Sequence, residues 1–131
     1  MAPENGGGEA DRQWIEVGCL DDIPRRGSRR VRGTDAGVPI ALFRTAEDVV
    51  FALVDRCPHR AGPLSEGIVQ GCAVACPLHG WVIDLASGQA EAPDEGSVPI
   101  IAVRVEDGRI LISAAGLVAA HEVLARAPKA A

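Results

Sequence analysis

Short apolar stretches separated by turn-forming residues dominate the chain between residues 13 and 113. These stretches are rich in Val, Ile, Leu and Ala, and hardly any of them repeats at the 3.6-residue spacing of an amphipathic helix. Such runs, when Gly, Pro and Asp flank them, are typical of strands joined by turns. The pattern therefore predicts short strands at 14–17, 38–44, 48–55, 67–71, 72–76, 81–85 and 97–113.

The last of these segments carries a hairpin signal. Asp107-Gly108 stands between two runs of alternating apolar residues, as in a two-residue hairpin turn. Regular short strands with such turns favour an antiparallel sandwich or small barrel. We therefore predict an all-β fold, with the loops of 57–79 inserted at one end of it.

The two ends of the chain differ from this central region. Residues 1–12 are polar and rich in glycine, which predicts a disordered leader. Residues 114–131 are rich in alanine and place apolar residues at helical spacing, so a short helix and a frayed extension are both open. The predicted organisation is a leader at 1–12, one folded domain at 13–113 and a tail at 114–131.

Composition and charge narrow the classes of function. The 131 residues are 47% hydrophobic and 24% charged, as in an ordinary globular domain. A net charge of −5 argues against a nucleic-acid partner, because phosphate binding needs a basic face. No apolar run approaches the roughly 20 residues of a membrane helix. Residues 1–12 also lack the basic and apolar parts of a signal peptide, so we expect a cytoplasmic protein with no membrane partner.

A basic cluster follows the first predicted strand. We expect it in a loop before the second strand, where a solvated loop and a docking surface for an acidic partner are the two alternatives. The cluster consists of Arg25, Arg26, Arg29, Arg30 and Arg32.

Four residues carry the candidate chemistry, in two Pro-containing turns that read CPHRAG and CPLHGW. The first turn contains Cys57 and His59, and the second contains Cys76 and His79. Two of the three histidines in the chain thus follow a cysteine within three residues, which is hard to attribute to chance.

Three interpretations of these residues compete. They could be core cysteines beside unrelated histidines, a structural zinc site, or a 2Fe-2S cluster with two histidines on one iron. Zinc accepts these ligands, but zinc modules usually pair Cys with Cys and His with His. Alternating Cys and His in two short loops favours the cluster. Cys19 and Cys72 lack such a pattern and are expected to be small buried hydrophobes, with a disulfide between them as the lesser alternative.

The two turns resemble the Rieske iron–sulfur signature. The resemblance implies one 2Fe-2S cluster, with Cys57 and Cys76 on one iron and His59 and His79 on the other. It also implies stacked antiparallel sheets with a small cluster-binding subdomain. Because neutral imidazoles replace two thiolates, such a cluster accepts an electron more readily than an all-cysteine one.

The resemblance is not to the high-potential respiratory type. Those proteins carry a further cysteine in each loop, and the two form a disulfide, whereas Gly62 and Leu78 stand at the matching positions here. Their hydroxyl donors after the second motif are replaced here by Trp81 and apolar residues. The departures imply a reduction potential low in the Rieske range and an electron carrier rather than a quinol-oxidising subunit.

A longer resemblance covers nearly all of residues 13–113 and includes the stretches WVIDL, SGQA and PDEG after the second turn. Over this length the chain resembles the small subunit of assimilatory NAD(P)H-dependent nitrite reductase. That implies a large-subunit partner with flavin, a 4Fe-4S cluster and sirohaem, which reduces nitrite to ammonium. The present chain has no dinucleotide-binding glycine loop, so it would be an accessory subunit without a complete active site. Its cluster would either relay electrons or serve docking and stability, and both roles are open. A free Rieske ferredoxin serving a ring-hydroxylating oxygenase is the alternative, and a zinc-stabilised interaction module is a third interpretation.

Overall fold

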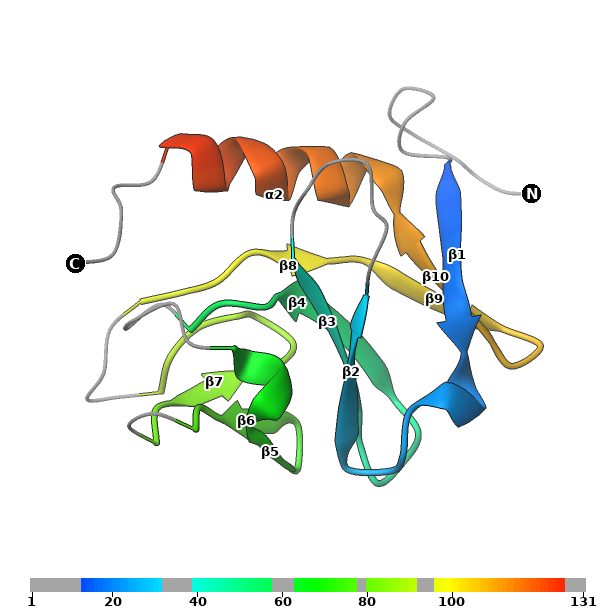
Figure 1. Ribbon diagram of the computed structural model, residues 1–131, viewed down its shortest axis with the longest axis horizontal. Coiled ribbons are helices and arrows are strands. Elements are labelled where there is room, and N and C mark those ends of the chain that lie inside the picture. Colours follow the sequence, from blue (N-terminus) through cyan, green and yellow to red (C-terminus); the bar gives the residue numbers. More distant parts are fainter. Residues whose placement is uncertain (1–12, 32–38, 58–62, 78–79, 92–95, 127–131) are drawn as a thin grey trace.

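The computed structural model describes residues 13–31, 39–57, 63–77, 80–91 and 96–126 (Figure 1). These residues form three antiparallel sheets, as the all-β prediction requires. The first has the order β1-β10-β9, the second β2-β3-β4-β8 and the third β5-β6-β7. The bounds are β1 Trp14–Cys19, β2 Gly27–Val31, β3 Ile40–Arg44, β4 Val50–Val54, β5 Ile68–Gln70, β6 Ala73–Ala75, β7 Val82–Asp84, β8 Ile100–Ile101, β9 Val103–Glu106 and β10 Arg109–Ser113. Two short 3-10 turns, η1 (Leu20–Asp22) and η2 (Leu64–Glu66), and one helix, α2 (Ala114–Arg126), complete the described elements.

The centre of the second sheet forms much of the hydrophobic core. All five residues of β3 are buried, and β4 pairs with it in a regular antiparallel register. A strand that is covered on both faces has no polar side to alternate with, which explains the continuous apolar sequence of this region. Strand β10 of the first sheet adds Ile110 and Ile112 to the same core.

Strand β2 occupies the region where the sequence predicted a loop, so the predicted loop position of Arg29 and Arg30 is wrong. Both residues lie in β2 and pair with Leu42 and Ala41 of β3. Because β2 is the edge of its sheet, it carries polar side chains along most of its length and shows no apolar alternation.

The segment 97–113, predicted to be one hairpin, contains strands of two different sheets. Strand β8 pairs with β4 in the second sheet, whereas β9 pairs with β10 in the first, so the chain changes sheets at Ala102. The turn itself is confirmed: Asp107 has φ 52° and Gly108 has φ 78°, the two positive values of a type I′ turn.

Helix α2 settles the choice between a helix and an extension after residue 113. It begins directly after β10, where the Ser113 hydroxyl accepts a hydrogen bond from the Gly116 N–H at 3.0 Å, in the manner of an N-cap. Within the described residues, no helix is long and apolar enough to cross a membrane.

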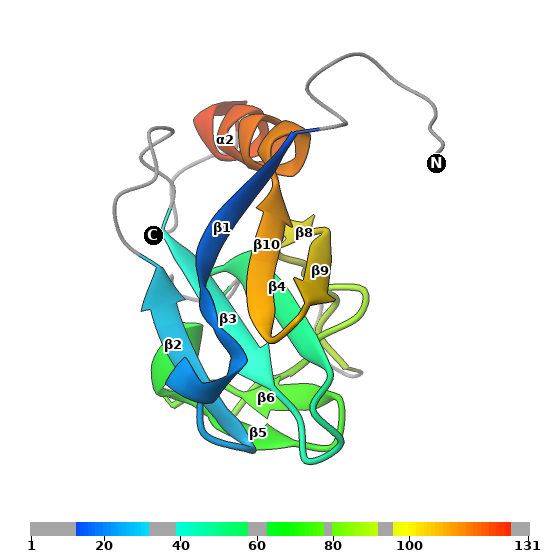
Figure 2. The ribbon, with the colours of Figure 1, turned by 90° about the vertical axis from the view of Figure 1, so that its right-hand side faces the viewer.

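The helix packs on the core. Leu117 and Ala120 are 4% and 3% exposed and belong to the core cluster. A Cβ at Gly116 would lie 3.0 Å from the Ile101 side chain, which shows how closely the first turn of α2 approaches β8. In both ribbon views α2 lies at one end of the molecule and strands β5 and β6 at the other (Figures 1 and 2).

Candidate metal centre

Both cysteines of the two predicted ligand turns are buried. Cys57 lies shortly after β4 and is 2% exposed, and Cys76 directly follows β6 and is 3% exposed. Both belong to the same hydrophobic cluster as the sheet residues around them. Two thiols supplied by loops but sheltered by the core are suited to hold a metal group whose sulfur side is kept from water.

The two predicted histidine ligands, His59 and His79, lie outside the described residues. Gly62 and Leu78, which stand where the respiratory type has its two further cysteines, lie outside the described residues as well. Within the described ranges, no three His, Cys, Asp or Glu side chains form a group that could hold a metal ion.

The other two cysteines are exposed, so their predicted burial is wrong. Cys19 ends β1 and Cys72 lies in the turn between β5 and β6. No disulfide joins them. At the end of a strand and in a tight turn, neither side chain has a core face to enter.

A buried carboxylate closes the first ligand loop. Asp55, two residues before Cys57, accepts hydrogen bonds from the Ser65 backbone N–H and the Ser65 hydroxyl, each at 2.7 Å. The side chain of Asp55 is fully buried, and Arg30 of β2 approaches it with Nε 3.3 Å from Oδ2. The sequence analysis did not single out Asp55 or Ser65, because neither belongs to a recognisable ligand pattern.

Strand β2 is attached to the same loop at a second point. The Ser28 hydroxyl donates a hydrogen bond to the Ser65 carbonyl. Ser28 and Arg30 are two positions apart on a strand and therefore point to the same side. One face of β2 thus contacts Ser65 and Asp55 through Ser28 and Arg30.

The second ligand loop is closed by its own backbone. The Cys76 N–H donates to the Trp81 carbonyl at 2.7 Å, and the Gly80 N–H donates to the Cys76 carbonyl at 3.0 Å. Gly80 has φ 74°, a conformation that a residue without a Cβ adopts easily. Trp81 is half-buried and packs against the core, so this turn is anchored from its C-terminal side.

The arginines of the basic cluster are largely paired with carboxylates. Arg29 lies 3.8 Å from Asp22, and Arg30 contacts Asp55 as described above. Arg25 donates to Asp48 at 2.9 Å. The positive charge of this region is therefore compensated locally. Arg32 lies outside the described residues.

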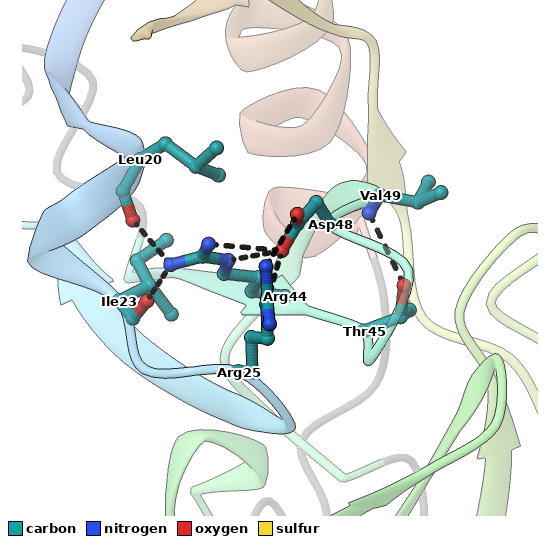
Figure 3. A network of polar contacts seen from close by, with 7 residues as sticks. All are labelled: Leu20, Ile23, Arg25, Arg44, Thr45, Asp48 and Val49. Carbon is teal, nitrogen blue, oxygen red and sulfur yellow. Dashed lines mark hydrogen bonds and ion pairs between the residues drawn. The ribbon is translucent and has the colours of Figure 1, made fainter.

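Asp48 connects Arg25 to the most buried arginine of this region (Figure 3). Hydrogen bonds from Arg25 and then from Arg44 hold the pKa of the Asp48 carboxyl below its ordinary value. Arg44 also donates to the backbone carbonyls of Leu20 at 3.1 Å and Ile23 at 2.6 Å, so one guanidinium joins the β3–β4 turn to both ends of η1. This network precedes β4, whereas Asp55 follows it, so the two lie at opposite ends of that strand.

His121, the third histidine of the chain, is exposed on α2.

Comparison with known proteins places these features in context. A family model for the Rieske [2Fe-2S] domain matches residues 13–105. The anthranilate 1,2-dioxygenase ferredoxin subunit of Burkholderia cepacia is 34% identical over 103 residues, which are 77% of this chain and 92% of that protein. The ferredoxin component of the naphthalene 1,2-dioxygenase/salicylate 5-hydroxylase systems of Ralstonia sp. is 31% identical over 102 residues, 77% of this chain and 95% of that protein. A solved structure from Mycobacterium tuberculosis, provisionally assigned as an NADH-dependent nitrite reductase small subunit, has a TM-score of 0.69 at 27% identity and covers 76% of this chain and 93% of its own.

Proposed function

The chain belongs to the Rieske [2Fe-2S] family, and on this premise we propose that it is the small subunit of an NAD(P)H-dependent nitrite reductase that converts nitrite to ammonium. Family membership implies one Rieske-type 2Fe-2S cluster and a role in electron transfer within an oxidoreductase system. When bound, such a cluster takes up one electron from a donor and releases it to an acceptor.

The proposed ligands are Cys57 and Cys76 on one iron and His59 and His79 on the other. The observation that carries this assignment is the burial of both cysteines on the two loops that follow β4 and β6. Burial keeps water from the sulfur ligands. Asp55 accepts hydrogen bonds from Ser65 across the first loop, and backbone hydrogen bonds join Cys76 to Gly80 and Trp81 in the second. The donor set of two thiols and two imidazoles fits a Rieske cluster.

The likeness to nitrite reductase small subunits supports the choice of partner. Between Trp81 and residue 96 the sequence resembles that family in three short stretches, WVIDL, SGQA and PDEG. This chain aligns with most of the Mycobacterium tuberculosis structure. It also aligns with most of a second solved structure of the same provisional assignment, at 28% identity and a TM-score of 0.67. The partner would be a large subunit with flavin, a 4Fe-4S cluster and sirohaem, and we place both in the cytoplasm, where the nicotinamide donor is available.

A second candidate function is that of a free ferredoxin for a ring-hydroxylating oxygenase. The curated ferredoxin relatives favour it, because they are 31–34% identical and are matched over 92–95% of their length. In both functions the chain carries electrons and does not itself hold the catalytic site.

The cluster and its ligands are tested together by metal analysis and electron paramagnetic resonance of the purified protein. We expect two iron atoms per chain and, after dithionite reduction, the low average g value of a histidine-ligated cluster. Cys57→Ser and Cys76→Ser should each abolish the signal, whereas Cys19→Ser and Cys72→Ser, at exposed cysteines, should leave it intact. One zinc per chain and no signal after anaerobic reconstitution would support the zinc-stabilised module instead.

The partner is tested by electron delivery under matched conditions. The reduced protein is mixed with a nitrite reductase large subunit in one reaction and with a ring-hydroxylating oxygenase in the other, and its reoxidation is followed by visible absorbance. The proposal requires faster reoxidation and a stable complex with the nitrite reductase. Complex formation and turnover with the oxygenase alone would establish the ferredoxin function in its place.

A further inference from the structure

Hydrogen bonds to the Asp55 side chain join described residues on either side of the first ligand turn. In the second loop the Cys76 N–H donates a hydrogen bond to the Trp81 carbonyl, and the Cys76 carbonyl accepts one from the Gly80 N–H. In the first loop the residues on either side of the ligand turn are joined through the carboxylate of Asp55 and through Ser65, ten positions later. Among the described residues of the first loop, a side chain thus joins the two sides of the ligand turn.

We propose that Asp55 is a positioning residue for the cluster: its carboxylate, oriented by Arg30, holds the chain beside Cys57 against Ser65 and β2 and so fixes the position of this ligand. This inference rests on the proposed ligand assignment. It adds to that assignment a residue that would bind no iron and would act only through the loop that it closes.

The burial of the Asp55 side chain makes its hydrogen bonds and its ion pair necessary. An ionised carboxylate out of contact with water is costly unless hydrogen bonds and an opposite charge compensate it. Asp55 has both, with two donors from Ser65 and the guanidinium of Arg30, and its side chain is fully buried. These partners lie on Ser65, beyond the ligand turn, and on Arg30 of β2. The carboxylate would therefore lose its compensation if Ser65 moved away.

Strand β2 holds the closure from outside. Ser28 binds the carbonyl of Ser65 while Arg30, on the same side of the strand, binds Asp55. Since β2 is paired with β3 along five residues, its position is set by the sheet rather than by the loop. The contact between Asp55 and Ser65 is therefore held against the second sheet.

The test uses the full-length, cluster-containing protein and variants of this contact. Asp55→Asn removes the charge and leaves at least one Ser65 donor unsatisfied, whereas Ser65→Ala removes one hydrogen bond without changing any charge. Outer contacts of metal ligands typically contribute 10- to 100-fold in affinity, so we expect both variants to lose the cluster to an iron chelator about 10- to 100-fold faster. Both should also change the g values of the reduced protein and its reduction potential.

Matched variants separate positioning from other effects. Ser65→Thr keeps the hydroxyl and should retain the wild-type rate and spectrum. Asp48→Asn removes an arginine-paired carboxylate at the other end of β4 and should leave the cluster signals unchanged. Circular dichroism of each variant reports whether the fold is intact.

Three outcomes would overturn the inference. Wild-type g values and chelation rates in both Asp55→Asn and Ser65→Ala would show that the closure does not position the ligands. If Ser65→Ala is silent while Asp55→Asn and Arg30→Gln shift the potential in opposite directions, Asp55 acts only through its charge. If the wild-type protein binds no iron–sulfur cluster, the proposed function fails and this inference fails with it, which distinguishes that case from the first two.

Discussion

Replacing Leu117 by alanine tests whether α2 is part of the folded core or a dispensable tail. Leu117 is 4% exposed, so nearly the whole side chain is removed from water on folding. The substitution deletes about three carbon atoms, which at about 0.8 kcal/mol each amounts to about 2.4 kcal/mol. A residual cavity adds to this, because buried Leu→Ala changes cost about 2–5 kcal/mol. We expect the free energy of unfolding to fall by about 3 kcal/mol.

The assay is a urea titration followed by far-ultraviolet circular dichroism. With a slope of about 1–3 kcal/mol per molar for a small protein, the midpoint should fall by about 1 M or more. The control is Val118→Ala, the next residue of the same helix, whose side chain is exposed and whose loss should cost less than about 0.5 kcal/mol. Both variants retain all four residues of the proposed ligand set, so its contribution cancels in the comparison. Equal midpoints for Leu117→Ala and Val118→Ala would refute the packing of α2 described above.

Three further predictions concern the ligand set and the arginine network. His79→Cys should keep iron but lower the reduction potential, because it adds a negatively charged ligand; an unchanged midpoint in a redox titration would exclude His79 as a ligand. Arg44→Met should lower the free energy of unfolding by about 2–3 kcal/mol in the urea assay, since two backbone carbonyls lose their donor, and a loss below about 0.5 kcal/mol would contradict this. The folded-state pKa of Asp48 lies below its unfolded value, so its contacts with Arg25 and Arg44 stabilise the protein above about pH 4 and are lost as the pH falls through the lowered pKa. Asp48→Asn should therefore reduce the loss of melting temperature between pH 5 and pH 2, and an identical acid dependence in both proteins would show that these contacts do not contribute.

Local sequence determined the features that depend on neighbouring residues alone. The Asp107-Gly108 turn is an example, because its two positive φ angles are accessible to these residue types in any hairpin. The cysteines at 57 and 76 were recognisable as candidate ligands for the same reason, since the spacing to their histidines lies within one turn. Periodicity likewise identified the all-β class, although it gave no sheet order.

The tertiary structure decided which segments pair and which side chains are covered. Strand β2 was missed because an edge strand exposes polar residues and shows no apolar alternation. The exposure of Cys19 and Cys72 depends on where a strand ends and which way a turn faces, and neither is encoded in a lone cysteine.

The closure of the first ligand loop has the same origin. Asp55 and Ser65 are ten residues apart, and the strand that supports them lies earlier in the chain. The hydrogen bonds exist because the sheet brings β2 beside the loop and removes water from the carboxylate. A buried charge acquires its partners through the packing of distant segments, and for this reason its role became visible only in the folded protein.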